Sequence, residues 1–502
     1  MGTFDNTPII VGAGQSVERD YSESSPMDLA GTAAKAAIRN SGGDRIADAI
    51  DTIAFVKLFS DSAPIWACKL GRSSNPPESV ARRIGAKPRG RIYSETCGSV
   101  PQTLLIEAFA DLQAGRRESV LLCGAEAIKN PRRAERSALP LDWNETHEVP
   151  LEDRGFGPMV VSPQELHNGL PAPIYYYSLM EDFRRQSLGF STAEYLRHEC
   201  ELLLSLNEVA ASNPYAQFPA ALSTDDLLGA EHITQIYTKR MVAQDSVNQG
   251  AALLLTTVAK ARQLGIPEEN WVFMHGAAYG MEHFMGTRPD LGRSPIAEQV
   301  VHRSLAMAGI GASELSLLDI YSCFPVAVTA VADALQRKTD GSDSLTLTGG
   351  LAYFGGPGNN YAMHSLAEMW SQLRHDRSQF GYVHANGGML SKHSGGVFSC
   401  RPSEAEWSQV GTVTPMDDQP ILEWEANPAK GTALAHCVHY RKGEPVAGVI
   451  LANTPEGKRF VCRTAKGELD TLRQLVADDP VGREIVTASG RSKEHEINFR
   501  FA

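Results

Sequence analysis

The chain has 502 residues, of which 42% are hydrophobic and 21% charged, and this balance is ordinary for a globular protein of about two to four domains. Its formal net charge of -12 and its lack of a basic run argue against a nucleic-acid-binding surface. No apolar run approaches the length of a membrane span, the start lacks the pattern of a signal peptide, and the eight cysteines include no C-x-x-C pair, so we expect reduced thiols in the cytoplasm.

The first part of the chain alternates predicted strands and helices. An apolar strand at Pro8 to Val11 runs into G-A-G-Q, which lacks the third glycine of a dinucleotide-binding loop and leaves that alternative weak. Ser25-Pro26 predicts a helix start, because serine is a good N-cap and proline suits the first helical turn. Further strands are predicted at Ile50 to Leu58 and at Ser119 to Cys123.

A cysteine lies in the turn between the strand and the helix of the segment Arg91 to Gly115. Apolar residues from Leu104 to Leu112 recur at helical spacing, and Pro101 suits the first helical turn. Cys97 would therefore meet the positive end of a helix, which favours the thiolate and hence a nucleophile. A small buried thiol is the alternative.

The second part of the chain repeats the first. Ser294-Pro295 starts another helix, Leu315 to Tyr321 forms a strand, and Cys323 lies in the following turn. This internal similarity predicts a duplicated α/β core with pseudo-twofold symmetry. We expect residues 1–129 with 241–265 to form the first half, 130–240 an inserted helical loop region, 266–401 the second half, and 402–502 a small all-β, barrel-like module.

These features resemble the thiolase superfamily, most closely the bacterial thiolase-like proteins near the sterol-carrier thiolases. Thiolases place their nucleophile in C-(A/G/S)-S-G-L-Q-A-V, and here Cys97 starts C-G-S-V-P-Q-T-L with the same spacing from cysteine to glutamine. The segments V-N-Q-G-A-A-L-L-L and N-P-Y-A are also similar to the family. The resemblance covers Thr7 to about Cys400 and implies that Cys97 is the acylated nucleophile.

The other family motifs are altered. The Gly-His-Pro loop reads Gly355-Gly356-Pro357 and the His-Asp-Cys-Phe motif reads Tyr321-Ser322-Cys323-Phe324, so both histidines are replaced. In the last motif, C-x-G-G-G, His384 stands where the second catalytic cysteine would be, followed by A-N-G-G. The resemblance thus implies His384 as the base for Cys97 and an oxyanion hole made by the amides of Cys97 and Asn386; a structural histidine is the alternative.

Three residues are candidate substrate contacts. Gly356 leaves space where the family has an imidazole, which would admit a bulky acyl group. His364 would substitute for the missing loop histidine, and Cys323 lies in the second turn, although a place in the core suffices for either. His436 and His439 point to opposite sides of a strand, so we expect no metal site.

The resemblance implies a transferase that cleaves a 3-oxo acid or 3-oxoacyl thioester, as in lipid or aromatic acid catabolism, through an acyl-cysteine intermediate. Coenzyme A would be a substrate, and we expect no tightly bound cofactor, no nucleic acid and no membrane partner. The rival is a non-catalytic thiolase-fold protein that binds acyl-CoA or supports a partner enzyme. The sequence leaves open the acyl group, the choice between free acid and thioester, and whether the protein is a homodimer.

Overall fold

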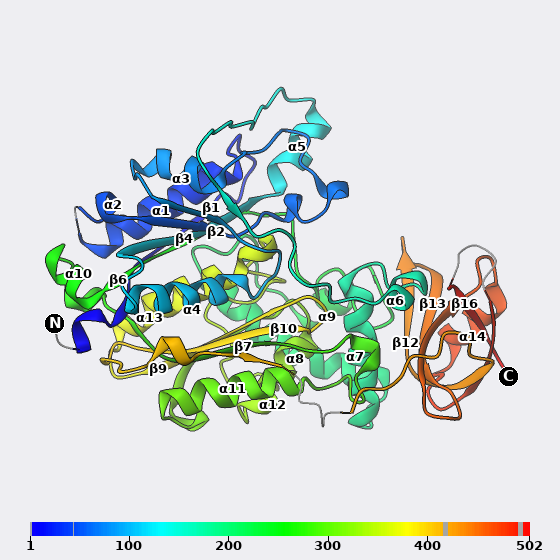
Figure 1. The fold of residues 1–502 in the computed structure, drawn as a ribbon. Helices are drawn as coiled ribbons and strands as arrows, with labels where there is room; N and C mark the ends of the chain where they lie inside the picture. Colours follow the sequence, from blue (N-terminus) through cyan, green and yellow to red (C-terminus); the bar gives the residue numbers. More distant parts are fainter. Residues whose placement is uncertain (1–2, 44, 415–419, 490–494) are drawn as a thin grey trace.

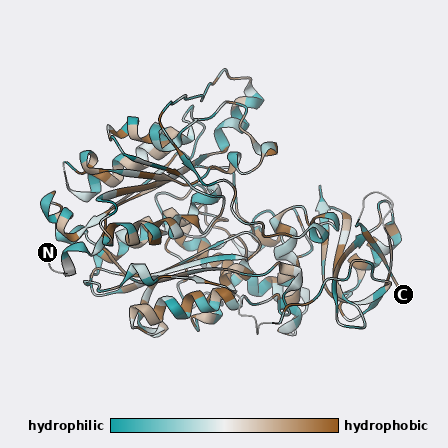
Figure 2. Ribbon diagram, in the orientation of Figure 1, coloured by the Kyte–Doolittle hydropathy of each residue, from teal (hydrophilic) through white to brown (hydrophobic). Residues whose placement is uncertain are grey.

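The computed structural model describes residues 3–43, 45–414, 420–489 and 495–502 and stacks most of them in layers (Figure 1). Two sheets face each other across a central layer of helices, and further helices cover the outer face of each sheet. Hydrophobic residues, brown in Figure 2, gather in the strands and on the helix faces that meet them. The predicted duplicated α/β core is therefore confirmed.

The N-terminal half contains a sheet with the strand order β1-β6-β4-β2-β3-β5. Its first helix begins where predicted, because the Ser25 side chain accepts a hydrogen bond from the amide of Asp28 and Pro26 occupies the first turn. The elements are β1 (Pro8–Val17), α1 (Pro26–Ser41), α2 (Ile46–Ala49), β2 (Thr52–Phe55), α3 (Pro76–Ile84), β3 (Gly90–Tyr93), α4 (Val100–Gln113), β4 (Ser119–Ala127), β5 (Glu152–Asp153), β6 (Asn248–Thr257) and α10 (Val258–Gln263), with 3-10 turns η1 (Thr3–Asn6), η2 (Phe59–Asp61) and η3 (Pro64–Trp66).

The C-terminal half repeats this plan with the strand order β11-β7-β10-β9-β8. Ser294 caps its first helix as Ser25 does in the other half, since its side chain accepts a hydrogen bond from the amide of Ala297. The elements are β7 (Phe273–Met281), α11 (Pro295–Ala308), β8 (Leu315–Ile320), α12 (Pro325–Ala334), α13 (Tyr361–His375), β9 (Phe380–Gly387), β10 (Lys392–Ser399) and β11 (Thr412–Val413), with 3-10 turns η4 (Glu268–Asn270), η5 (Met285–Thr287), η6 (Ala312–Glu314), η7 (Gly358–Asn360) and η8 (Trp407–Gln409).

Helices α4 and α13 form the layer between the two sheets (Figure 1). Leu105 and Phe109 of α4 and Leu366 and Trp370 of α13 belong to one hydrophobic cluster with strands of both sheets. Burial on both sides explains why α4 is apolar around most of its circumference, because each sheet needs its own apolar partner face. This packing fixes the start of α4, where Cys97 lies.

The inserted region is helical, as predicted, and a closed five-stranded barrel follows the core. The predicted all-β module also contains a helix, whose Leu472 and Leu475 pack into the barrel. The elements are α5 (Lys129–Ser137), α6 (Pro163–His167), α7 (Pro173–Ser187), α8 (Thr192–Ser212), α9 (Thr224–Leu228), β12 (Lys430–Arg441), β13 (Glu444–Asn453), β14 (Arg459–Thr464), α14 (Leu469–Ala477), β15 (Glu484–Ser489) and β16 (Ile497–Phe501).

The barrel begins later than the predicted boundary at residue 402. Trp407 packs edge-on against Phe109 of α4, with ring centroids 5.2 Å apart, and β11 pairs with β7 of the C-terminal sheet. The chain therefore completes the core before it enters β12.

The barrel is attached to the inserted helices by buried charges. On α7, Asp182 accepts a hydrogen bond of 2.8 Å from the ring of His436 on β12 and pairs with Arg185 at 2.8 Å. Burial alone would raise the pKa of Asp182, but His436 and Arg185 outweigh it and lower that pKa. Two residues of β13, Val449 and Leu451, also join the hydrophobic cluster of the inserted helices. The barrel and the inserted region therefore share a core.

Candidate active site

Cys97 lies in the turn between β3 and α4, as the sequence predicts. Its side chain is only 4% exposed, and its Sγ shares a hydrogen bond of 3.1 Å with Ser99 Oγ. A Cβ atom at Gly387, the last residue of β9, would lie 2.1 Å from Sγ. Only glycine fits there. Because Gly387 has no side chain, the C-x-G-G-G-like motif can lie directly against the sulfur of Cys97.

The structure does not support the expected thiolate. Burial raises the pKa of the Cys97 thiol above its usual value, although the charge of Lys392 and hydrogen bonds with Ser99 act in the opposite direction. A thiol at the start of a helix is acidic only where solvent or a cation stabilises its charged form, and here dehydration prevails. Cys97 is therefore a protonated thiol near neutral pH, and its reactions require a proton acceptor.

A pocket of about 400 Å³ adjoins the Cys97 turn, and we call it the Cys97 pocket. Its wall combines the turn of the N-terminal half, the matching turn of the C-terminal half, the altered Gly-His-Pro loop and the end of β9. The sequence-predicted residues Cys323, Gly356 and Asn386 are thus brought together. The wall residues that matter for chemistry are Gly98, Tyr321, Cys323, Gly356, Asn386 and Gly387.

A small polar network lines one side of this pocket. The Asn386 side-chain amide donates a hydrogen bond of 2.9 Å to the Tyr177 hydroxyl and lies 3.7 Å from Cys323 Sγ. Among the residues that the structure describes, Asn386 Oδ1 is buried without a hydrogen-bond partner. Burial raises the pKa of Cys323 to about 12, so this thiol is protonated. The wall therefore offers an unpaired acceptor and a neutral S–H group to a ligand.

Tyr321 is a site residue that the sequence analysis noted only as a lost histidine. It lines the Cys97 pocket, and its hydroxyl lies so close to the Cys97 turn that a Cβ atom at Gly98 would be 2.7 Å from it. Burial raises the pKa of Tyr321 well above its usual value, so it carries its proton. The replacement of a family histidine by another proton-carrying side chain was the available signal. Tyr177 gave no such signal, because it comes from the inserted region.

His384 lies on the opposite face of β9 from Cys97. Strand residues alternate between faces, and Gly387 is the position that faces Sγ, so His384 points away from it. Its Nδ1 is hydrogen-bonded to the Tyr382 hydroxyl at 3.0 Å and its Nε2 to His393 Nδ1 at 3.1 Å. Burial lowers the pKa of His384 well below its usual value. Within the described residues, the structure thus gives His384 two partners other than Cys97, as in the structural alternative.

Of the predicted substrate contacts His364 and Gly356, only Gly356 lies on the wall of the Cys97 pocket. The His364 ring is fully buried, with Nδ1 hydrogen-bonded to Gln15 at 2.7 Å, and burial lowers its pKa to about 3. It is not part of the Cys97 pocket wall, and no wall residue in the described part of the chain is a histidine. Gly356 does line the pocket, and the nearest atom to a Cβ at this position would be the Gln244 carbonyl oxygen at 3.3 Å.

The two histidines that raised the question of a metal have separate partners, since His436 pairs with Asp182 and His439 stacks on Tyr175. In residues 3–43, 45–414, 420–489 and 495–502, no group of three or more His, Cys, Asp or Glu side chains is placed to hold a metal ion. The described helices also include none that is long and apolar enough to cross a membrane.

The duplicated halves, the cysteine turn before α4 and the glycine-rich end of β9 define a thiolase-superfamily protein with an added C-terminal barrel. A monomeric SCP2-thiolase like protein type 1 from Mycobacterium smegmatis is 35% identical, with a TM-score of 0.82 and 99% of each chain covered. This chain therefore belongs to the SCP2-thiolase-like proteins.

Two more distant solved structures share the fold. An Ltp2-ChsH2(DUF35) aldolase is 18% identical with a TM-score of 0.57, covering 80% of this chain and 99% of the other. An acetyl-CoA acetyltransferase from Syntrophomonas wolfei is 14% identical with a TM-score of 0.55, covering 78% and 99%. Neither a protein-family model nor a curated protein sequence matches the chain.

Proposed function

We propose that the protein binds a 3-oxoacyl-CoA thioester in the Cys97 pocket and cleaves it by passing the acyl group through Cys97 to a second coenzyme A. The observation that carries this proposal is the contact of Cys97 Sγ with Gly387, a residue of the pocket wall. A bound ketone carbon on that wall would be next to the thiol. Orienting the two reactants in this way is itself a large part of catalysis.

The oxyanion would be stabilised by amides at the start of α4. The amide nitrogens of Gly98 and Ser99 lie 2.9 and 3.4 Å from the Cβ position of Gly387, the same place that Sγ approaches. Amides at a helix start carry partial positive charge and suit a developing negative oxygen. The sequence-based oxyanion amides of Cys97 and Asn386 remain part of the proposal, and coenzyme A is a substrate rather than a resident cofactor.

The proton of Cys97 must end on the carbon that leaves. Attack of sulfur on the ketone forms the C–S bond, and cleavage of the C–C bond releases the enolate of acetyl-CoA, which becomes acetyl-CoA when its carbon gains a proton. Thiolysis by coenzyme A then frees Cys97 with its proton restored. In place of an imidazole, the hydroxyl of Tyr321 and the thiol of Cys323 face the pocket and can relay this proton.

A second candidate, binding of acyl-CoA without chemistry, is favoured by two observations. The Cys97 pKa is raised, and the pocket wall lacks a histidine among the described residues. A general base is typically worth about 10²–10⁴ in rate, so acylation without one would be slow. The function would then be to hold the thioester for another protein.

Intact-protein mass spectrometry separates these candidates. The wild type, Cys97→Ala, Tyr321→Phe and His384→Ala are mixed with a 3-oxoacyl-CoA, and the acyl adduct is followed before and after coenzyme A is added. We expect an adduct on the wild type that coenzyme A discharges, none on Cys97→Ala, a slower one on Tyr321→Phe and a normal one on His384→Ala. Binding of the thioester with no adduct would select the second candidate, and no binding would refute both.

We also propose that the protein is a monomer, since its M. smegmatis relative is described as monomeric. Strand β3 is paired with β5 on its outer side, Ile92 with Glu152 and Tyr93 with Asp153. The edge of this sheet is therefore β5, and a strand of two residues is too short to form a continuous sheet with a second copy. Sedimentation at increasing protein concentration tests this, and a dimer mass would contradict it.

A further inference from the structure

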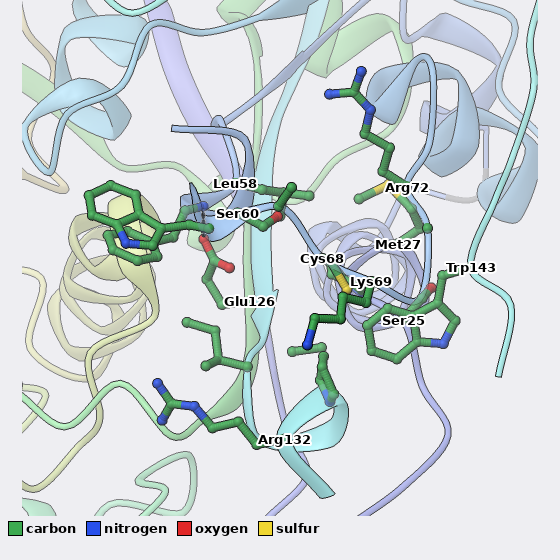
Figure 3. A pocket seen from close by; sticks show the side chains of 18 of the residues that line it. Ser25, Met27, Leu58, Ser60, Cys68, Lys69, Arg72, Glu126, Arg132 and Trp143 are labelled. Carbon is green, nitrogen blue, oxygen red and sulfur yellow. Dashed lines mark hydrogen bonds between the residues drawn. The ribbon is translucent and has the colours of Figure 1, made fainter. Parts of the chain in front are cut away.

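Figure 3 shows a second cavity, of about 220 Å³, which shares wall residues with the Cys97 pocket and therefore lies beside it. Its walls come from the start of α1, the segment between β2 and α3, the end of β4, helix α5 and Trp143. The side chains of Met27, Leu58, Trp66 and Trp143 make much of its lining apolar. We call it the Glu126 pocket, after the one buried carboxyl among its lining residues.

The two pockets are separated by a wall that is about one side chain thick. Phe59, Ile128 and Asp245 line both of them. Gly358 lines the Cys97 pocket, yet a Cβ atom there would lie 2.4 Å from Glu126 Oε1 and 3.1 Å from Phe59 Cβ. A ligand that extends from the Cys97 pocket past Gly358 would therefore meet Glu126.

Glu126 is positioned to act on a ligand. Its side chain is 3% exposed, and its Oε1 accepts a hydrogen bond of 2.6 Å from the amide of Phe59. Its other carboxyl oxygen is directed into the cavity in Figure 3. Burial raises the pKa of Glu126 to about 8, and the charges of Asp61 and Asp245 act in the same direction. Near neutral pH this carboxyl is therefore mostly protonated and can donate a hydrogen bond into the cavity.

The cations that line this pocket do not lower the pKa of Glu126 again, because each is already paired with an acid. Arg132 binds Asp245 at 2.7 Å, Lys69 lies 3.4 Å from Glu135, and Arg72 lies 3.7 Å from Asp61. Burial also raises the pKa of the Cys68 thiol, so it too stays neutral. The charged and titratable groups that face or line the cavity are thus Asp61, Cys68, Lys69, Arg72, Arg132, Glu135 and Asp245.

We propose that the Glu126 pocket holds the distal end of the acyl group, and that the Glu126 carboxyl donates a hydrogen bond to an oxygen at that end. This inference rests on the proposed binding of a 3-oxoacyl thioester in the Cys97 pocket. The substrate class it defines is an apolar acyl chain that carries a ketone or another acceptor oxygen far from its thioester. The apolar walls bind the chain, and the single donor selects the oxidised end.

A pair of ligands tests this proposal. One is an unbranched long-chain 3-oxoacyl-CoA, and the other is the same molecule with a ketone beside its terminal methyl group, an acceptor that cannot donate. Their dissociation constants are measured by calorimetry at about pH 6.5 and about pH 9.5, either side of the Glu126 pKa. The full-length Cys97→Ala protein is used to prevent turnover, alone and combined with Glu126→Gln, Glu126→Met or, as the matched control, Glu148→Gln at an exposed position.

In the parent protein we expect the distal ketone to tighten binding by about fivefold to tenfold at the lower pH. The advantage should disappear at the higher pH, because a carboxylate cannot donate to a ketone. Glu126→Gln should keep the advantage at both pH values, since its amide can donate while its oxygen accepts from Phe59. Glu126→Met should lose it at both, and Glu148→Gln should behave as the parent.

Two outcomes would overturn the inference while leaving the proposed function standing. One is equal affinity for the two ligands in the parent at the lower pH. The other is a ketone preference that survives in Glu126→Met, which would place the donor elsewhere. If neither ligand binds, the proposed function fails and this inference fails with it. Circular dichroism of each variant establishes that the protein compared is folded.

Discussion

Replacing Glu126 with glutamine should stabilise the protein near neutral pH, although it removes a buried carboxyl side chain. The ordinary pKa of glutamic acid is 4.5, and burial raises that of Glu126 to about 8. At about pH 7 an unfolded chain ionises this carboxyl, whereas the folded protein holds it neutral. The free energy of unfolding therefore falls by about 1.4 kcal/mol for each pH unit above 4.5, or by roughly 3 kcal/mol at pH 7.

The sign follows from proton binding. Between about pH 4.5 and pH 8 the folded state binds the Glu126 proton and the unfolded state does not, so stability falls as pH rises through this window. Glutamine does not titrate, and its oxygen can still accept the hydrogen bond from Phe59. The stability of Glu126→Gln relative to wild type should therefore be lowest near pH 4.5 and rise by roughly 3 kcal/mol at pH 7.

Urea unfolding of the two proteins across this pH range measures the difference, and groups that titrate equally in both cancel. Because a chain of this size need not unfold in one step, the transition midpoints are compared for each transition separately. Glu148→Gln serves as the control for loss of an exposed glutamate and should track the wild type. A difference between Glu126→Gln and wild type that does not vary with pH would show that Glu126 titrates normally, which would refute the reasoning.

Three further outcomes are expected. Peptide mapping after brief iodoacetamide treatment should show Cys68 labelled faster than Cys97, because Cys68 is partly exposed and Cys97 is buried with a raised pKa; faster labelling of Cys97 would contradict this. Gly387→Ala should slow acylation of Cys97, followed by mass spectrometry, by about 10² or more, since the alanine Cβ would displace Sγ. An unchanged rate would show that the contact between Gly387 and Sγ is unimportant. Deletion of 430–502 should leave aggregating protein, because barrel strands complete the core of the inserted helices; a soluble, compact remainder on size-exclusion chromatography would show the two are independent.

The fold was predictable because it is specified by local signals that occur twice. The serine-proline pairs at Ser25 and Ser294 start equivalent helices, and each half places a cysteine turn before an apolar helix. Such signals act within a few residues, so they can be read without knowing the tertiary contacts. Helix α14 was not predicted because its local signal is weak: its two inward leucines form too short a pattern to stand out between strands.

The site was predictable only in part, because motif position does not determine side-chain direction. Asn386 and Gly356 line one pocket together with Gly98 of the Cys97 turn, since glycine and turn positions tolerate few alternatives. The sequence also made His384 the base for Cys97, but His384 lies three residues before Gly387, which faces Sγ, so strand alternation turns its ring to the other face of β9, toward Tyr382 and His393. The Glu126 pocket could not have been predicted, because segments far apart in the sequence form it.

The protonation states of the groups on the pocket wall set what each candidate function requires. An imidazole can both take and return a proton near neutral pH, whereas the raised pKa values of Cys97, Tyr321 and Cys323 make all three groups proton donors. Donors assist the later step, in which an enolate carbon must be protonated, and they do not help the first, in which the thiol must lose its proton. If Cys97 is acylated, the acceptor must come with the ligand or the proton must move in concert with C–S bond formation. Acylation that is slow but independent of His384 is the kinetic signature of such an enzyme, and thioester binding without acylation is the signature of its non-catalytic rival.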